Sequence, residues 1–302
     1  MTPADLTFQL DVAHWGWSIA AFLFFVGIAG MGSVAYAFVR RTAVIATIFV
    51  SLVVGLLLVV SHLGRWWNLP RTLFLMVRDL ELNFGSWMLI GITVLGIHLV
   101  LALVALVAHL PFLTQRLSWL AWTERVDASK AFLGTFAFVG FFATVYSGFL
   151  ITQAVGIPLW NNPLIPVLWV ISGSIAAIAV LELLYVVGAV DAKVSTFGVR
   201  LGMALDGMKL LAVLGFLHVA ASYGSAGARY GATLMTSGDL AWMTWAMVVG
   251  VGILVPLAIG AYTLLREKNK ALLTVSALSA LVGVFFLRAT VLLAGTFEPL
   301  VL

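Results

Sequence analysis

The chain has 302 residues, of which 63% are apolar and 9% charged, and its mean hydropathy is +1.14. Soluble domains are about half apolar and about a quarter charged, so this composition excludes a soluble globular fold. The absence of cysteine excludes disulfides, iron–sulfur clusters and thiolate metal sites on this chain.

Apolar runs fill most of the sequence. A helix needs about 20 apolar residues to cross about 30 Å of hydrocarbon. Runs of this length occupy roughly 15–39, 42–61, 85–108, 131–154, 164–189, 203–223, 240–264 and 271–295. We therefore predict an all-α, polytopic membrane protein with eight transmembrane helices, forming one integral domain over residues 1–302. Histidines near the same end of the second and sixth spans, His62 and His218, favour two four-helix halves, at about 14–154 and 163–296.

The basic residues are distributed unevenly between the two sides. The loops that follow the first, third, fifth and seventh spans hold ten of the sixteen Lys and Arg residues, and the opposite side holds four. Lys209 and Arg288 are the remaining two and lie inside spans. Because cytoplasmic loops carry an excess of Lys and Arg, both termini are predicted outside the cytoplasm.

Two loops are long enough to have structure. Segment 64–83 mixes Trp66 and Trp67 with three arginines, a pattern that fits an amphipathic helix at the membrane interface or a surface for an extramembrane partner. Segment 112–129 has two tryptophans and two arginines and is interpreted as interfacial anchoring. Neither is large enough for a catalytic domain, so the chemistry must take place in the bilayer or on another subunit.

Three ionisable residues lie in the cytoplasmic part of the second half. Glu182 is on the fifth span, and Asp206 and Lys209 are three residues apart on the sixth, hence on one helix face. Charges at this depth are costly and mark functional candidates. Either Asp206 and Lys209 pair to hold helices together, or the three residues form a proton relay or ion site.

Other titratable groups gather toward the outer side. Arg288, in the outer half of the eighth span, could snorkel, pair with a carboxylate or attract an anionic or semiquinone-like ligand, and we favour a buried polar role. The outer span ends and the outer half of the fourth span hold His14, His62, His218 and Tyr146. His98 is expected to be a core histidine with satisfied hydrogen bonds, and His109 is expected to be solvated at a cytoplasmic loop.

Histidines on spanning helices also raise the hypothesis of a b-type haem. Such a haem needs two imidazoles that face each other at similar depth. His62 and His218 could supply them only if the second and sixth spans face each other, and His98 has no evident partner at its depth.

Several segments together carry a family resemblance. They are HWGWSIAAFLFFVGIAGMG at 14–32, SHLGRWWNLPR at 61–71, NFGSWMLIG at 83–91, YSGFLITQAVGIPLWNNPLIPVLWVISG at 146–173 and FFLRATVLLAG at 285–295. In identity, order and spacing the sequence resembles the NrfD/polysulfide reductase membrane subunit family over nearly its whole length. The resemblance implies two four-helix bundles and a subunit without haem that reacts with quinone or quinol (menaquinone or ubiquinone).

The resemblance also implies partners and site residues. Such subunits dock to a multi-cluster, ferredoxin-like iron–sulfur subunit, itself bound to a molybdopterin catalytic subunit. The family's helix-four tyrosine corresponds to Tyr146, and His14 and Trp17 occupy its helix-one region. A histidine expected further along helix one is replaced by Ala20 or its neighbours, which leaves His14 or His62 as substitutes.

We therefore predict a quinone-reactive anchor of a respiratory oxidoreductase in the prokaryotic inner membrane. Its partners would lie on the periplasmic face and the substrate site on another subunit. The predicted quinone-binding residues are His14, Trp17, His62, Arg65, Tyr146 and Arg288. The predicted proton path is Glu182, Asp206 and Lys209, and no residue is expected to bind metal. The second hypothesis is a secondary transporter or ion-translocating subunit, and the third is a b-type cytochrome.

Overall fold

A computed structural model describes residues 13, 15–63, 65–78, 85–266 and 269–297. These residues form helices and no strand, and eight helical segments among them are long and apolar enough to cross a membrane. The predicted all-α polytopic fold is therefore confirmed. The start of α1 and the end of α12 lie at the same end of the molecule, because the Ala13 amide donates to the Gly295 carbonyl (3.1 Å).

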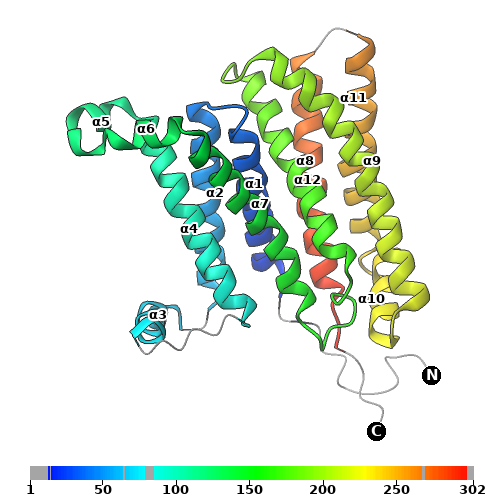
Figure 1. Ribbon diagram of the computed structural model, residues 1–302. Coiled ribbons are helices and arrows are strands. Elements are labelled where there is room, and N and C mark those ends of the chain that lie inside the picture. Colours follow the sequence, from blue (N-terminus) through cyan, green and yellow to red (C-terminus); the bar gives the residue numbers. More distant parts are fainter. Residues whose placement is uncertain (1–12, 14, 64, 79–84, 267–268, 298–302) are drawn as a thin grey trace.

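The first four spans form one bundle (Figure 1). It consists of α1 (Trp17–Tyr36), α2 (Thr42–Ser61), α4 (Trp87–Ala108) and α7 (Lys130–Thr152). Side-chain oxygens of Ser86 and Ser129 accept hydrogen bonds from backbone amides in the first turns of α4 and α7, which fixes where these helices begin.

The second bundle holds the other four spans. They are α8 (Leu164–Val186), α9 (Ala192–Tyr223), the π-helix η4 (Met243–Leu254) continued by α11 (Val255–Leu265), and α12 (Lys270–Leu293). Pro256 lies in the first turn of α11, where its missing N–H removes one donor from the helical ladder, so the backbone passes from π to α geometry there. α1 and α7 pack against α8, and α1 also packs against α12, which joins the two bundles.

Short helices cover the two ends of the molecule. At the end where α1 begins lie η2 (Trp66–Asn68), α3 (Leu69–Arg78) and α10 (Ala226–Thr236), with α3 set apart from the bundle (Figure 1). At the opposite end lie α5 (Pro111–Arg116), η3 (Ser118–Leu120) and α6 (Trp122–Ala128). Trp66, Trp67, Trp119 and Trp122 are exposed, as both interfacial interpretations require.

The sixth span is longer than predicted. We predicted it at 203–223, but α9 begins at Ala192 and has 32 residues. At about 1.5 Å per residue it is about 48 Å long, more than a bilayer core requires. Lys193 and Arg200, assigned to a loop by their charge, are exposed on the first turns of this helix. The hydropathy pattern missed these turns because they extend beyond the apolar part of the helix.

Glycines bring two helix pairs into close contact. A Cβ on Gly30 of α1 would overlap the Gly140 carbonyl of α7, and a Cβ on Gly252 of η4 would overlap the Gly283 backbone of α12. Helices approach this closely in membranes when small residues line their interface. The second contact is close to Lys209, which places a charged side chain beside tightly packed backbone.

Candidate functional site

Tyr146 occupies the interface between α4 and α7. Its side chain is 4% exposed, and its ring stacks on Trp87 with the centroids 6.3 Å apart. The hydroxyl lies directly over Gly91, where a Cβ would overlap it. Among the described residues it has no hydrogen-bond partner. A buried hydroxyl without a partner is a costly feature, and a ligand oxygen beside it would relieve that cost.

Two of the predicted quinone-binding residues lie near this end of the first bundle. His62 follows the last turn of α2, and its Nδ1 is 3.3 Å from the Ser18 hydroxyl in the first turn of α1. Arg65 is exposed in the turn after His62. His14 lies outside the described residues. His62 therefore shares a bundle with Tyr146, at the end where α1 begins.

Trp17 and Arg288 have different surroundings. Trp17 is 49% exposed and stacks on Phe285 of α12, with centroids 6.0 Å apart. Arg288 is fully buried between α1, α8 and α12, with its guanidinium 5.4 Å from the Trp169 ring centroid and against Gly27. The favoured buried role of Arg288 is thus observed. The contacts do not bring these two residues together with Tyr146.

Most of the Arg288 guanidinium is without partners. Nη1 donates to the Val284 carbonyl of its own helix (3.2 Å). Nε and Nη2 are buried and have no partner among the described residues. A buried cation with two unpartnered nitrogens, which together carry three N–H donors, offers a site to an anion or a carbonyl oxygen.

The pairing of Asp206 with Lys209, one of the two alternatives, is observed in the second bundle. Lys209 is fully buried, and its Nζ lies 3.1 Å from Asp206 Oδ1. The same Nζ donates a 2.6 Å hydrogen bond to the Gly252 carbonyl of the π-helix η4. Arg288 is near enough to repel Lys209 electrostatically. Lys209, Arg288 and Asp206 are thus all buried in the second half of the molecule.

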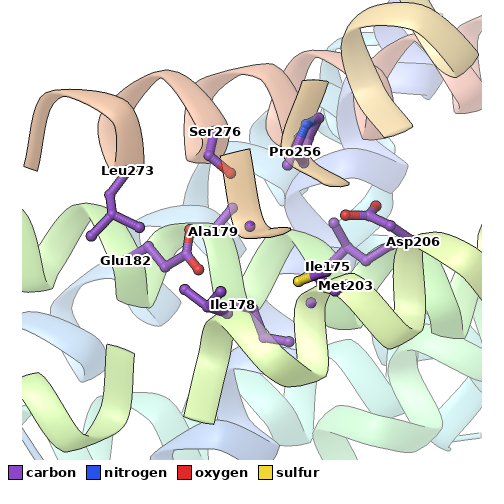
Figure 2. A pocket seen from close by; sticks show the side chains of 13 residues that line it. Ile175, Ile178, Ala179, Glu182, Met203, Asp206, Pro256, Leu273 and Ser276 are labelled. Atoms are coloured by element: carbon purple, nitrogen blue, oxygen red, sulfur yellow. The ribbon is translucent and has the colours of Figure 1, made fainter. Parts of the chain in front are cut away.

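A cavity between α8, α9, α11 and α12 brings Glu182 and Asp206 together (Figure 2). It holds about 30 Å³, room for about two water molecules. In Figure 2 the two carboxylates lie at different sides of the cavity, with Met203 and Ile175 between them, and Ser276 adds a hydroxyl from α12. Two of the three residues of the predicted proton path thus line one cavity, and Lys209 contacts the second of them.

A cluster that the sequence analysis missed lies at the opposite end of the first bundle. Asp127 of α6 is 2% exposed and accepts hydrogen bonds from the Tyr36 hydroxyl (2.8 Å) and from Arg40. His109, expected to be solvated, is instead 19% exposed; its Nε2 lies 2.8 Å from the Tyr36 hydroxyl and 3.5 Å from Asp127 Oδ2. We name Tyr36, Arg40, His109 and Asp127 the Asp127 cluster.

Opposing effects act on the Asp127 carboxyl. Burial raises its pKa, but hydrogen bonds from His109, Arg40 and Tyr36 and the positive charge of Arg40 outweigh that effect, so its pKa lies below the ordinary value. The same carboxylate raises the pKa of Arg40. Little in the sequence signals this cluster, because Asp127 stands in a polar segment, WTERVDA, that resembles an exposed loop.

Only one of the two ring nitrogens of His98 has a hydrogen-bond partner among the described residues, contrary to expectation. It is fully buried on α4, and its Nε2 lies 2.7 Å from the Ser33 hydroxyl of α1. Its Nδ1 has no hydrogen-bond partner in the described part of the protein.

A haem between His62 and His218 would require the two imidazoles to face each other. The two residues lie in different bundles, on α2 and α9.

Eight hydrophobic helices that enclose charged and titratable side chains define an integral membrane protein of the helical-bundle class. The family model described as polysulphide reductase, NrfD, matches residues 5–299. The chain therefore belongs to the NrfD family, as its sequence motifs predicted.

Curated relatives agree with this assignment. The protein is 27% identical to "Protein NrfD" of Escherichia coli (strain K12), over 95% of its own length and 96% of that protein. It is also 27% identical to a polysulfide reductase subunit of Wolinella succinogenes, with the same coverage of both sequences. An NrfD homolog of Haemophilus influenzae is 26% identical, over 93% of the present sequence and 94% of that protein.

Proposed function

We propose that this protein is the membrane subunit through which a molybdopterin-type respiratory oxidoreductase exchanges electrons with the quinone pool. The observation that carries the proposal is full-length membership of a family that includes a subunit of polysulfide reductase, in a fold without an extramembrane catalytic domain among its described residues. The catalytic and iron–sulfur subunits would bind on the periplasmic face of the prokaryotic inner membrane, and the quinone would be menaquinone or ubiquinone.

The residues at the Tyr146 end of the first bundle fit a quinone head. When bound, a quinone accepts or releases two electrons and two protons, and its two oxygens require hydrogen-bond partners. The Tyr146 side chain is buried, its hydroxyl has no partner among the described residues, and the lack of a side chain at Gly91 makes room for this hydroxyl. His62 offers its remaining ring nitrogen at the same end, and His14 and Arg65 complete the proposed set.

Trp17 and Arg288 contribute differently to the same proposal. Trp17 packs on α12 and would form an apolar wall at the mouth of the site. Arg288 is enclosed where the two bundles meet and would attract negative charge with Nε and Nη2, which have no partner among the described residues. Its place between the bundles suits a residue that links quinone chemistry with the charges of the second bundle.

The test uses the complete complex. Tyr146→Phe should lower quinol-linked turnover at least about tenfold, since general acid–base groups contribute that much or more. Tyr262→Phe, at an exposed tyrosine of α11, is the matched control and should turn over as the wild type does. Unchanged turnover in Tyr146→Phe, His14→Ala and His62→Ala would show that the quinone does not bind at these residues.

Proton conduction through the second bundle is a further part of the proposal. The cavity that Glu182 and Asp206 share supports it, since water there could join the two carboxylates. Asp206→Asn and Glu182→Gln should retain the partner subunits and bound quinone but reduce the membrane potential generated in proteoliposomes. Normal potential in both variants would leave the Asp206–Lys209 pair a structural role.

Purification separates this function from the alternatives. A quinone-reactive anchor should copurify with iron–sulfur and molybdopterin subunits and with extractable quinone. Solute transport by the isolated subunit would favour a secondary transporter, and a Soret band would favour a b-type cytochrome. Alkaline phosphatase fusions in segment 64–83 should be active and fusions after Lys193 inactive, and the reverse would place the partners on the other face.

A further inference from the structure

The first bundle contains a line of polar groups that the proposed function does not use. It consists of His98 and Ser33 near the middle of the bundle and of the Asp127 cluster at the end opposite to the start of α1. Ser33 and Tyr36 are three residues apart on α1 and so lie on one face of that helix. Phe136 of α7 packs between the two levels, because its ring contacts both His98 and Tyr36, at 5.5 and 5.8 Å between centroids.

The hydrogen bonds at His98 favour one tautomer of its ring. The Ser33 hydroxyl has one hydrogen and donates it to the Ala29 carbonyl (3.0 Å). Ser33 Oγ therefore accepts from His98 Nε2–H across the 2.7 Å contact. The Nδ1 of a neutral imidazole is then a lone pair, and here it is buried without a partner among the described residues. This atom is a proton acceptor inside a membrane-spanning helix.

The Asp127 cluster links this line to the aqueous side. Thr42, at the start of α2, lies 3.2 Å from the Nδ1 of His109, the nitrogen that faces away from Tyr36. Arg40 and His109 are partly exposed, whereas Asp127 is buried and Tyr36 fully so. The partly exposed His109 is therefore hydrogen-bonded to Tyr36 inside the bundle. A purely structural tie between α6 and α1 would not require an imidazole that bridges the two.

At its other end the line approaches Tyr146. Gly91 and His98 are seven residues apart on α4, hence two turns apart on one face and separated by about 10 Å along the axis. The Tyr146 hydroxyl lies on Gly91. Along α1, the backbones of Ser33 and Tyr36 are separated by about 4.5 Å of axial rise.

We infer that the first bundle carries its own proton route, in which His98 holds protons that pass between the Asp127 cluster and the quinone site at Tyr146. The inference rests on the proposed function. Reduction of the quinone consumes two electrons from the iron–sulfur partner and two protons, and the route supplies those protons one at a time. Oxidation of the quinol releases them in the opposite direction. Only O–H and N–H bonds form and break along the route.

The test compares variants of the complete complex in proteoliposomes with a short-chain naphthoquinol as the probe. His98→Gln and Asp127→Asn should lower the proton-coupled rate at least about tenfold. They should also increase the solvent deuterium isotope effect, because a remaining proton transfer becomes rate-limiting. The naphthoquinol should bind as it does to the wild type. A structural role would not raise the isotope effect.

A matched pair of serines controls for folding. Ser33→Ala removes the acceptor for His98 Nε2–H and should slow the same step, whereas Ser172→Ala removes an equally buried hydroxyl that bonds only its own helix and should change neither the rate nor the isotope effect. If His98→Gln does not assemble, Ser33→Ala and Asp127→Asn decide the question.

Two failures are distinguishable. Wild-type rates and isotope effects in His98→Gln, Ser33→Ala and Asp127→Asn, in a complex that oxidises the naphthoquinol, overturn the route alone. A wild-type complex that exchanges no electrons with quinone overturns the proposed function, and the route with it.

Discussion

The two bundles bury polar groups in different ways. In the first, neutral groups such as His98, Ser33 and Tyr36 lie along the helices, and the charged members of the Asp127 cluster lie beyond the spanning helices. In the second, Asp206, Lys209 and Arg288 are charged groups inside the spans, enclosed by tight backbone contacts. Neutral groups tolerate low dielectric, while full charges require paired partners. The first bundle meets solvent through Arg40 and His109, whereas Lys209 and Arg288 are fully buried.

The largest effect should follow from removal of the Lys209 charge. Lys209→Met leaves the buried Asp206 carboxylate without its ion partner, and breaking such a pair typically costs about 3–5 kcal/mol of stability. We expect a large loss of folded protein and a lower Tm in detergent. Lys209→Met combined with Asp206→Asn should recover most of the loss. If the double variant is as unstable as the single one, the Asp206–Lys209 pair is not the source of the effect.

Gly91 should come next. In Gly91→Ala the new Cβ would overlap the Tyr146 hydroxyl and displace the ring. Turnover with quinol should therefore fall about tenfold, which corresponds to an activation barrier about 1.4 kcal/mol higher. Gly96→Ala on the same helix is the control, because a Cβ there has no contact within 4 Å. Equal turnover in the two variants would show that the position of Tyr146 does not matter.

The Asp127 cluster should respond to pH. Because the carboxyl pKa is lower in the folded protein than its ordinary value of 3.8, the unfolded chain binds the proton more readily. Its contribution to stability is therefore present above about pH 4 and is lost as the pH falls through the folded value. The Tm of the wild type should exceed that of Asp127→Asn at pH 6, and the difference should shrink as the pH is lowered below about 4. A constant difference would contradict this account.

The smallest effect is expected at an exposed pair between the bundles. Arg41 donates to Asp191 at 2.6 Å, but both side chains are more than half exposed. Exposed ion pairs contribute about 0.2–1 kcal/mol. Asp191→Ala should therefore change the Tm little, and added salt should reduce even that change. A loss comparable to that of Lys209→Met would mean that this pair holds the two bundles together.

Part of the candidate site could be predicted from the sequence. The three-residue spacing of Asp206 and Lys209 made their pairing one of two alternatives, since positions i and i+3 share a helix face. Arg288 was correctly placed in a buried polar environment, because a mid-span arginine cannot easily reach solvent. The shared cavity of Glu182 and Asp206 was only suggested by depth, since span order alone does not determine which helices are neighbours.

Other features depend on contacts between distant segments. Asp127 becomes buried only because α6 folds against the ends of α1 and α4, and its sequence surroundings are those of an exposed loop. The orphan nitrogen of His98 follows from the position of Ser33, 65 residues away. The Gly252 carbonyl that accepts from Lys209 belongs to a π-helix, and an apolar run in the sequence does not distinguish a π-helix from an α-helix.

The sequence by itself determined the all-helical membrane fold, the eight spans and the family, because hydrophobic length and local motifs are properties of contiguous residues. Only the tertiary structure decided which polar groups meet. Helix packing brings Tyr146 onto Gly91, His98 onto Ser33 and Glu182 into a cavity with Asp206. The physical reason is that helix–helix contacts in a membrane depend on close steric fit and interhelical hydrogen bonds between segments far apart in the sequence, which no local pattern encodes.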